Sequence, residues 1–336
     1  MNRTVPLLPF HVTEYFPEVA DLARPTTLLY PRAGRPSVHA SSMGGPLLWP
    51  ADEPWPHCRA PDHYRPLRQP VETVGPEAVA LVPVLQLYAR EVPDLLVPTG
   101  SDLLQMLWCP LMHPPSHAPS PVLRWWRTSD IVMGPLLTQP PPPWEYDEQC
   151  VPRPCVVHPT RATEYPGWDL PGELGQVVRR HSAEIEETLG LSYWDAAVAT
   201  QTKVGGYPGW TQPPDWPVCG CGRRMEHLLT VHSREPAMGD PWLPEEDRVG
   251  SGPMWRRPVA PDVEPRIGPG LSLGDMGGVY VFVCTVCPGS PYEHRYDCAL
   301  EDLQHVAAPP GRRAEDRPFV PVTGPAPGSG QRSPHW

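Results

Sequence analysis

The chain has 336 residues, which is long enough for one large domain or two modest ones with a core that needs no disulfides. It carries 27 basic and 38 acidic residues, and the resulting net charge of −11 argues against a nucleic-acid binder whose affinity comes from neutralising phosphates. No apolar run approaches the roughly 18 to 20 residues that span a bilayer, and the N-terminus lacks the continuous apolar region of a signal peptide. We therefore expect a cytoplasmic protein with neither nucleic-acid nor membrane partners; its oligomeric state stays open.

The composition favours short strands joined by turns. The chain contains 53 prolines and 28 glycines, which interrupt long regular elements, but also 13 tryptophans and 40% hydrophobic residues, which indicate folded segments between the breaks. Three proline-rich stretches without apolar periodicity are predicted to be loops or unstructured: residues 60–76, 140–154 and 308–336.

One segment, residues 173–189, has the periodicity of a helix. Its apolar side chains recur at intervals of three and four residues, and Gly190 is expected to end it. A second, shorter helical turn is predicted at 193–199. Strands are predicted at 80–89, 102–108, 225–232 and 279–284, which are rich in Val, Leu, Tyr and Phe and bounded by Gly or Pro.

The two halves of the chain share a pattern. In each half a Gly-Gly pair is followed ten residues later by Trp and thirteen residues later by Cys; the positions are Gly45, Trp55 and Cys58, then Gly206, Trp216 and Cys219. The predicted strands follow in matching places, so the pattern indicates an internal duplication, against the alternative that Gly, Pro and Trp recur by chance.

These elements predict an α+β fold of mostly antiparallel sheet, internally duplicated about a pseudo-twofold axis, with one main helix between the repeats. The expected organisation is an N-terminal segment (1–40), a first, degenerate repeat (41–138), a proline-rich linker (139–170), a helical segment (171–200), a second repeat with a zinc site (201–305) and a disordered tail (306–336).

The cysteines predict one structural zinc ion. Two tight turns carry paired cysteines, and a tetrahedral zinc ion takes four thiolates at about 2.3 Å; the predicted ligands are Cys219, Cys221, Cys284 and Cys287. The alternative is four ordinary buried thiols. A thioredoxin-type redox role for Cys284 and Cys287 fits poorly, because that chemistry needs a helix after the first cysteine and Pro288 follows instead. Cys150, Cys155 and Cys298 are expected to be free thiols.

The first repeat keeps only half of this set. Cys58 and Cys109 match Cys219 and Cys284, whereas Ala60 and Met112 stand where the partner cysteines would be. A second zinc site formed by His57, Cys58, Cys109 and His113 is chemically reasonable, and so is a degenerate repeat that has lost its metal.

The second half resembles a known family. The resemblance rests on Lys203-Val-Gly-Gly206, on Trp216-Pro217 with the Cys219-Gly-Cys221 turn, and on the strand from Val279 to Cys284. These motifs resemble those of the YwqG-like family, a bacterial domain of unknown function, and are similar more weakly to the programmed cell death 2 family, which is associated with escorting a ribosomal protein. The resemblance covers residues 200–298 well and 40–113 weakly; it implies a duplicated β-rich fold and no catalytic residue. The family commonly has a glutamine near the position of Thr230. This chain has that glutamine only in the first repeat, as Gln86.

We therefore expect a zinc-stabilised binding or assembly protein that engages a protein client, with no catalytic or cofactor-binding residues beyond the metal ligands. The alternative is a hydrolase-like or metal-dependent enzyme with a cleft between the repeats. No nucleotide-binding, serine-hydrolase or zinc-protease motif supports it. His227 is expected to be a partly exposed polar residue on a strand, and five-residue spacing keeps it from meeting His232 at one metal ion.

Overall fold

The computed structural model describes residues 3–5, 8, 10–64, 77–237, 240–253, 256–274 and 277–297. The described residues all belong to one compact unit. The predicted tail (306–336), the end of the second repeat (298–305) and Cys298 lie outside the described residues, as does most of the predicted loop 60–76.

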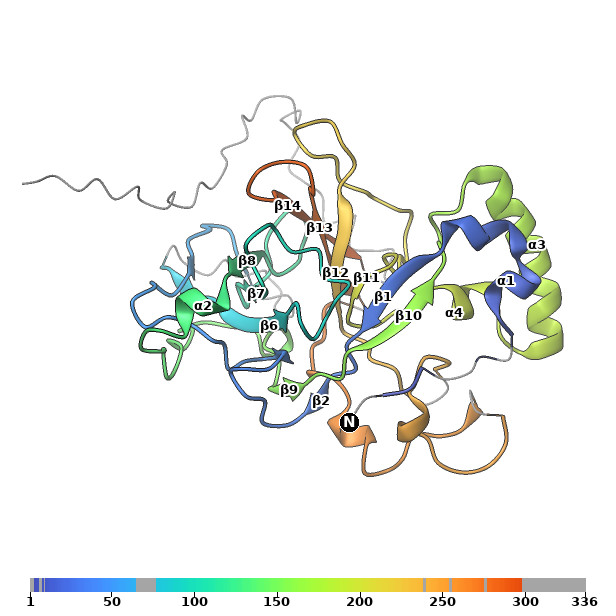
Figure 1. Ribbon diagram of the computed structural model, residues 1–336, viewed down its shortest axis with the longest axis horizontal. Coiled ribbons are helices and arrows are strands. Elements are labelled where there is room, and N and C mark those ends of the chain that lie inside the picture. Colours follow the sequence, from blue (N-terminus) through green and yellow to red (C-terminus); the bar gives the residue numbers. More distant parts are fainter. Residues whose placement is uncertain are drawn as a thin grey trace, which may run out of the picture. The chain divides into compact units, whose positions relative to one another are not determined.

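A six-stranded antiparallel sheet runs in the order β10-β1-β11-β12-β13-β14 (Figure 1). Its strands, in chain order, are β1 (Arg24–Leu28), β10 (Thr160–Glu164), β11 (Lys203–Gly205), β12 (Glu226–His232), β13 (Gly278–Val283) and β14 (Tyr292–Asp297). The last four are neighbours in the order in which they occur in the chain. This arrangement brings the loop before β12 close to the loop after β13.

A second six-stranded antiparallel sheet has the order β2-β9-β3-β6-β7-β8. Its strands are β2 (Arg32–Ala33), β3 (Ser42–Met43), β6 (Val82–Tyr88), β7 (Leu103–Trp108), β8 (Pro121–Trp126) and β9 (Cys155–Val156). The short strands β4 (His57–Cys58) and β5 (Val79–Ala80) pair separately. Their pairing holds His57 and Cys58 beside the segment that leads into β6.

Among the described residues the helices are few and mostly short. They are α1 (Val12–Tyr15), α2 (Thr128–Ile131), α3 (Gly172–Leu189) and α4 (Tyr193–Ala197), with 3-10 turns at Pro17–Leu22, Glu148–Cys150, Glu245–Asp247 and Glu264–Arg266. The helices α1, α3 and α4 gather beyond the β1/β10 end of the first sheet (Figure 1). An apolar cluster that includes Phe16, Val178 and Tyr193 packs them together.

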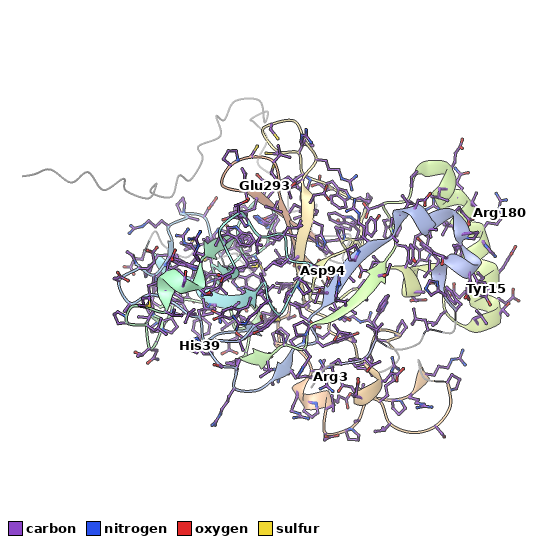
Figure 2. All side chains as sticks on the ribbon, in the orientation of Figure 1. Arg3, Tyr15, His39, Asp94, Arg180 and Glu293 are labelled. Atoms are coloured by element: carbon purple, nitrogen blue, oxygen red, sulfur yellow. The ribbon has the colours of Figure 1, made fainter. Side chains whose placement is uncertain are left out.

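The largest apolar cluster draws on both six-stranded sheets. It contains Val84 and Leu104 from the second sheet and Leu229 and Val281 from the first, all fully buried. Side chains fill the space between the strands (Figure 2). The two sheets therefore share one core, which fixes the loops at their ends relative to each other.

The structure confirms an α+β fold of mostly antiparallel sheet with few helices. The predicted helix 173–189 is α3, which ends at Gly190 in the left-handed region with φ 74°, and the turn predicted at 193–199 is α4, opened by a capping box between Ser192 and Asp195. The four predicted strands correspond to β6, β7, β12 and β13. No helix among the described residues is long and apolar enough to cross a membrane.

The N-terminal segment (1–40) and the proline-rich linker (139–170) contain strands that the sequence analysis did not predict. They contribute β1, β2, β9 and β10, and β1 pairs with both β10 and β11. Arg24–Leu28 and Thr160–Glu164 have no apolar run to mark them as strands. Their structure comes from pairing with distant segments, which local patterns cannot predict.

Candidate metal centres

The four predicted cysteine ligands come together at one end of the first sheet. Cys219 and Cys221 lie in the turn before β12, where the N–H of Gly222 donates to the Cys219 carbonyl at 2.8 Å. Cys284 directly follows β13, and Cys287 lies in the loop to β14. Because β12 and β13 are adjacent strands, their pairing brings the two turns to the same place.

The sulfur positions fit a tetrahedral zinc ion. The Sγ atoms of Cys219 and Cys287 are 3.8 Å apart, as are those of Cys221 and Cys284, and all four lie within 4.8 Å of one another. Zn–S bonds of about 2.3 Å in a regular tetrahedron place the sulfurs about 3.8 Å apart. A disulfide would need about 2.05 Å, and the described cysteines are all free. This set can therefore hold a metal with little rearrangement.

The backbone around the cluster favours a thiolate. The N–H groups of Cys287 and Val286 donate to the Cys284 sulfur and lower the pKa of this thiol to about 6. The thiolate is the form that binds zinc. After Cys287 the chain turns into β14 without starting a helix, so the helix N-terminus that a thioredoxin-type cysteine requires is missing at this site.

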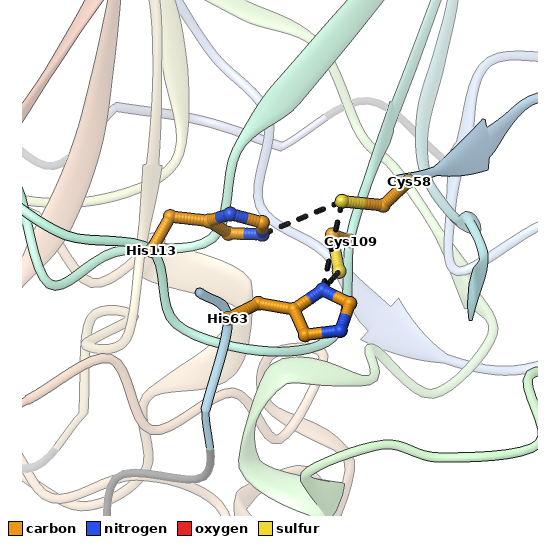
Figure 3. Close-up of side chains that lie close together, drawn as sticks. All are labelled: Cys58, His63, Cys109 and His113. Carbon is orange, nitrogen blue, oxygen red and sulfur yellow. Dashed lines mark hydrogen bonds between the residues drawn. The ribbon is translucent and has the colours of Figure 1, made fainter. Parts of the chain in front are cut away.

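A second cluster lies in the first half of the chain, and its members differ in one position from the predicted set. It consists of Cys58, His63, Cys109 and His113, whose ligand atoms all lie within 4.8 Å of one another (Figure 3). Cys58 Sγ is 3.7 Å from His63 Nδ1 and 3.9 Å from His113 Nε2. Cys109 Sγ is 3.8 Å from the same His63 nitrogen.

The prediction that His57 completes this set is wrong. His57 is exposed, and its Nδ1 is 2.8 Å from the Trp55 carbonyl oxygen. His57 and Cys58 are consecutive residues of β4, and consecutive side chains of a strand point to opposite faces. This alternation argued against His57 and Cys58 as ligands of the same metal ion. His63, which is fully buried, lies outside any regular element and gave no comparable signal.

The environment of the second cluster also favours a thiolate. Hydrogen bonds from the Cys109 thiol, from His113 and from the Ala60 N–H lower the pKa of Cys58 to about 3. The same contact with Cys58 raises the pKa of Cys109, as does burial. The contact between the two sulfurs therefore favours one thiolate in the pair.

His227 and His232 are buried in β12, which corrects the expectation that His227 is partly exposed. Nδ1 of His227 is 2.9 Å from the Gly205 carbonyl and Nε2 is 2.9 Å from the Thr230 hydroxyl, so both ring nitrogens are engaged. Burial lowers the pKa to about 3 for His227 and to about 4 for His232. Both are therefore neutral at pH 7, and His227 is held as a structural residue.

Comparison of the chain with known proteins gives no further guide to these sites. No family model matches the chain, and no curated protein is significantly similar to it in sequence.

Proposed function

We propose that the protein is a zinc-stabilised, internally duplicated binding or assembly protein of the cytoplasm, which engages a protein client beside the four-cysteine site. The observation that carries the proposal is a complete set of four thiol ligands. Four protein ligands leave a tetrahedral zinc ion no open position for water or substrate, which is typical of structural sites. The resident metal in this proposal is Zn²⁺, bound by Cys219, Cys221, Cys284 and Cys287.

The strand pairing supports the proposed duplication. The strands β3, β6, β7 and β8 are neighbours in the same order as β11, β12, β13 and β14. Ser42 pairs with Gln86 as Lys203 pairs with Thr230. Each long central strand also has a register shift at the corresponding place, between Pro83 and Leu85 and between His227 and Leu229. Such agreement also supports the resemblance to the YwqG-like family, which we keep as a proposal.

The surface beside the four-cysteine site supports a binding role. Val218 and Val286, which directly precede Cys219 and Cys287, are 64% and 56% exposed. A zinc ion would hold these two apolar side chains in fixed positions, and rigid apolar groups lose little entropy on binding. The net charge of −11 favours a basic client, and the free thiols suit a reducing compartment such as the cytoplasm.

The enzyme alternative rests on a pocket of 530 Å³ lined by residues of both halves, among them Asp94, Leu95, Gly206 and His227. Asp94, beside β1 in Figure 2, accepts hydrogen bonds from Thr27 Oγ1 at 2.7 Å and from Arg161 at 2.7 and 3.0 Å. His227 has both ring nitrogens engaged. Asp94 and His227 thus serve the fold, which favours the binding role over catalysis.

The proposal is tested by affinity capture of the tagged holoprotein from its native lysate. We expect a reproducible protein partner that is recovered with the wild type and lost with the Val218→Asp/Val286→Asp double variant. Val177→Asp, at a valine of α3 that is 47% exposed, is the matched control and should keep the partner. Failure to recover any reproducible partner contradicts the binding role, and equal recovery by the double variant contradicts the proposed surface.

A further inference from the structure

The cluster in the first half of the chain has four ligand atoms converging from two loops. Cys58 and His63 come from the segment that begins with β4, and Cys109 and His113 from the segment that follows β7. We propose that these residues bind a second structural zinc ion, with Nδ1 of His63 and Nε2 of His113 as the nitrogen ligands. The comparison of this second site with the four-cysteine site rests on the proposed duplication. The geometric evidence for the second site does not depend on that proposal.

The interatomic distances match those of a two-thiolate, two-imidazole site. Zn–S bonds of about 2.3 Å and Zn–N bonds of about 2.0 to 2.1 Å place sulfur and nitrogen about 3.6 Å apart in a tetrahedron. Three of the four sulfur–nitrogen distances are 3.7, 3.8 and 3.9 Å, and all four ligand atoms lie within 4.8 Å of one another. The two imidazole rings meet at an interplanar angle of 75° with centroids 5.7 Å apart, so they do not stack. These three sulfur–nitrogen distances exceed the tetrahedral value by only about 0.1 to 0.3 Å, so the ligand atoms are close to the arrangement that zinc requires.

Burial explains why the two sites have different ligands. His63, Cys109 and His113 are all buried, and Cys109 belongs to an apolar cluster with Trp49 and Leu107. Zinc with two thiolates and two neutral imidazoles has no net charge, whereas zinc with four thiolates has a charge of −2. A buried net charge is expensive. The charged set includes the exposed Cys221, whereas the neutral set has three buried members and the half-buried Cys58.

The main alternative is a nucleophilic cysteine, because a thiolate beside an imidazole is also the arrangement of cysteine hydrolases. Such a pair needs one histidine and free access to the sulfur. Here a second histidine and a second thiol converge on the same point, and the three other groups surround Cys58. Two thiols and two imidazoles have no shared role in that chemistry, whereas together they complete the coordination of one metal ion.

The decisive experiment is the zinc content of holoprotein purified without chelator, measured by elemental analysis. We expect two zinc ions per chain in the wild type, one in His63→Ala and two in His57→Ala, the matched control for the neighbouring histidine outside the cluster. The Cys219→Ser/Cys284→Ser variant should retain one. A wild type with one zinc ion that the Cys219→Ser/Cys284→Ser variant loses would overturn the proposal while leaving the four-cysteine site intact.

A second variant guards against loss of zinc through misfolding. Since His63 faces the cluster with Nδ1, the ring nitrogen nearer the backbone, a cysteine sulfur at this position reaches almost the same point. His63→Cys is therefore expected to keep two zinc ions. His113 faces the cluster with the distal Nε2, which a cysteine cannot reach, so His113→Cys should keep one. Zinc loss in both variants to the same extent contradicts the assigned ligand atoms.

Thiol alkylation separates the metal site from a nucleophile. In the zinc-loaded wild type we expect Cys58 to resist iodoacetamide until a chelator is added, with peptide mass spectrometry as the readout. Rapid alkylation of Cys58 in protein that carries its full zinc complement would identify it as a free nucleophile and overturn the proposal. This outcome is independent of whether the protein recovers a client, so it is distinguishable from failure of the proposed function.

Discussion

At the scale of single residues, Glu235 is a buried carboxyl group with one oxygen that has no partner among the described residues. It is 5% exposed, and its Oε1 accepts a hydrogen bond from the Thr202 N–H at 3.2 Å, so the oxygen without a partner is Oε2. Burial raises its pKa to about 8. The folded protein therefore keeps this carboxyl protonated at pH 7, whereas the unfolded chain ionises it.

The stability that Glu235 contributes is complete below its unfolded pKa, near 4.5, and is lost as pH rises through about 8. At about 1.4 kcal/mol per pH unit, the loss between pH 5 and pH 7.5 is about 3 kcal/mol. Glu235→Gln mimics the protonated form and does not titrate. We predict that the variant gains about 3 kcal/mol of unfolding free energy over the wild type between pH 5 and 7.5, measured by denaturant unfolding.

Comparing Glu235→Gln with the wild type isolates the effect of Glu235 on the unfolding free energy. Burial lowers the pKa of His227 to about 3 and that of His232 and His294 to about 4, so these histidines stabilise the fold above pH 6.5 and their contribution is lost as pH falls. Their effect has the opposite sign but is common to both proteins and cancels. Glu187→Gln, at an exposed position of α3, should show no gain; an equal gain there would refute the prediction.

At the scale of elements, the Gly-Gly pairs end β3 and β11 with backbone that other residues adopt at a cost. Gly44 and Gly45 have φ of 69° and 80°, and Gly205 and Gly206 have φ of 70° and 66°. At Gly206 a Cβ would also overlap Glu164 Oε2 and lie 2.9 Å from Thr26 Cβ. The carboxylate cannot move aside easily, since Lys203 Nζ donates to it at 2.7 Å and the Tyr207 N–H at 2.9 Å.

We therefore predict that Gly206→Ala lowers the unfolding free energy by about 2 to 5 kcal/mol, because left-handed strain of about 1 to 2 kcal/mol adds to overpacking of about 1 to 3 kcal/mol. Gly250→Ala is the control, since Gly250 has φ 88° and its nearest neighbour is an ordinary contact at 3.9 Å. It should cost only about 1 to 2 kcal/mol, the strain alone. Equal losses for the two variants in thermal unfolding would show that the space around Gly206 does not matter.

The elements that the sequence predicted are those with strong local signals. The apolar periodicity of α3 and the β-branched and aromatic residues of β12 and β13 act within one segment, so they can be read without knowing the partners. The strand β1 contains Arg24, Pro25 and two threonines, and it is ordered by β10 and β11. Its pairing depends on residues far along the chain, which no local pattern reports.

The two candidate metal sites also differ in how far they could be predicted from the sequence. Cys219 with Cys221 and Cys284 with Cys287 are close in sequence, and one strand pair, β12 with β13, is enough to join them. His63 reaches its cluster only because the loop after β4 folds back, where the Tyr64 N–H donates to the Met112 carbonyl at 3.0 Å. The identity of the fourth ligand, His63, therefore depends on how this loop folds. The spacing of residues in the sequence could not predict it.

At the scale of the whole molecule, the proposed zinc ions link ligand binding to folding. The four-cysteine site borders an apolar cluster in which Trp210 packs with Phe282 and Tyr280. A ligand that binds only the folded state stabilises it by about 4 kcal/mol when its free concentration is 1,000 times Kd. Loss of zinc should therefore weaken the packing of this cluster as well as the two turns.

We predict that chelation of the zinc-loaded wild type lowers its unfolding free energy by at least about 4 kcal/mol, with a change in tryptophan fluorescence from Trp210 and Trp216. Cys219→Ser/Cys284→Ser should be less stable than the wild type before chelation and should respond less to it. Cys150→Ala removes a fully buried thiol outside both clusters and should lose stability by a constant amount, leaving the chelator response at its wild-type size. If the wild type unfolded at the same temperature with and without chelator, metal binding and folding would not be coupled, and the four thiols would have to stabilise the turns by packing alone.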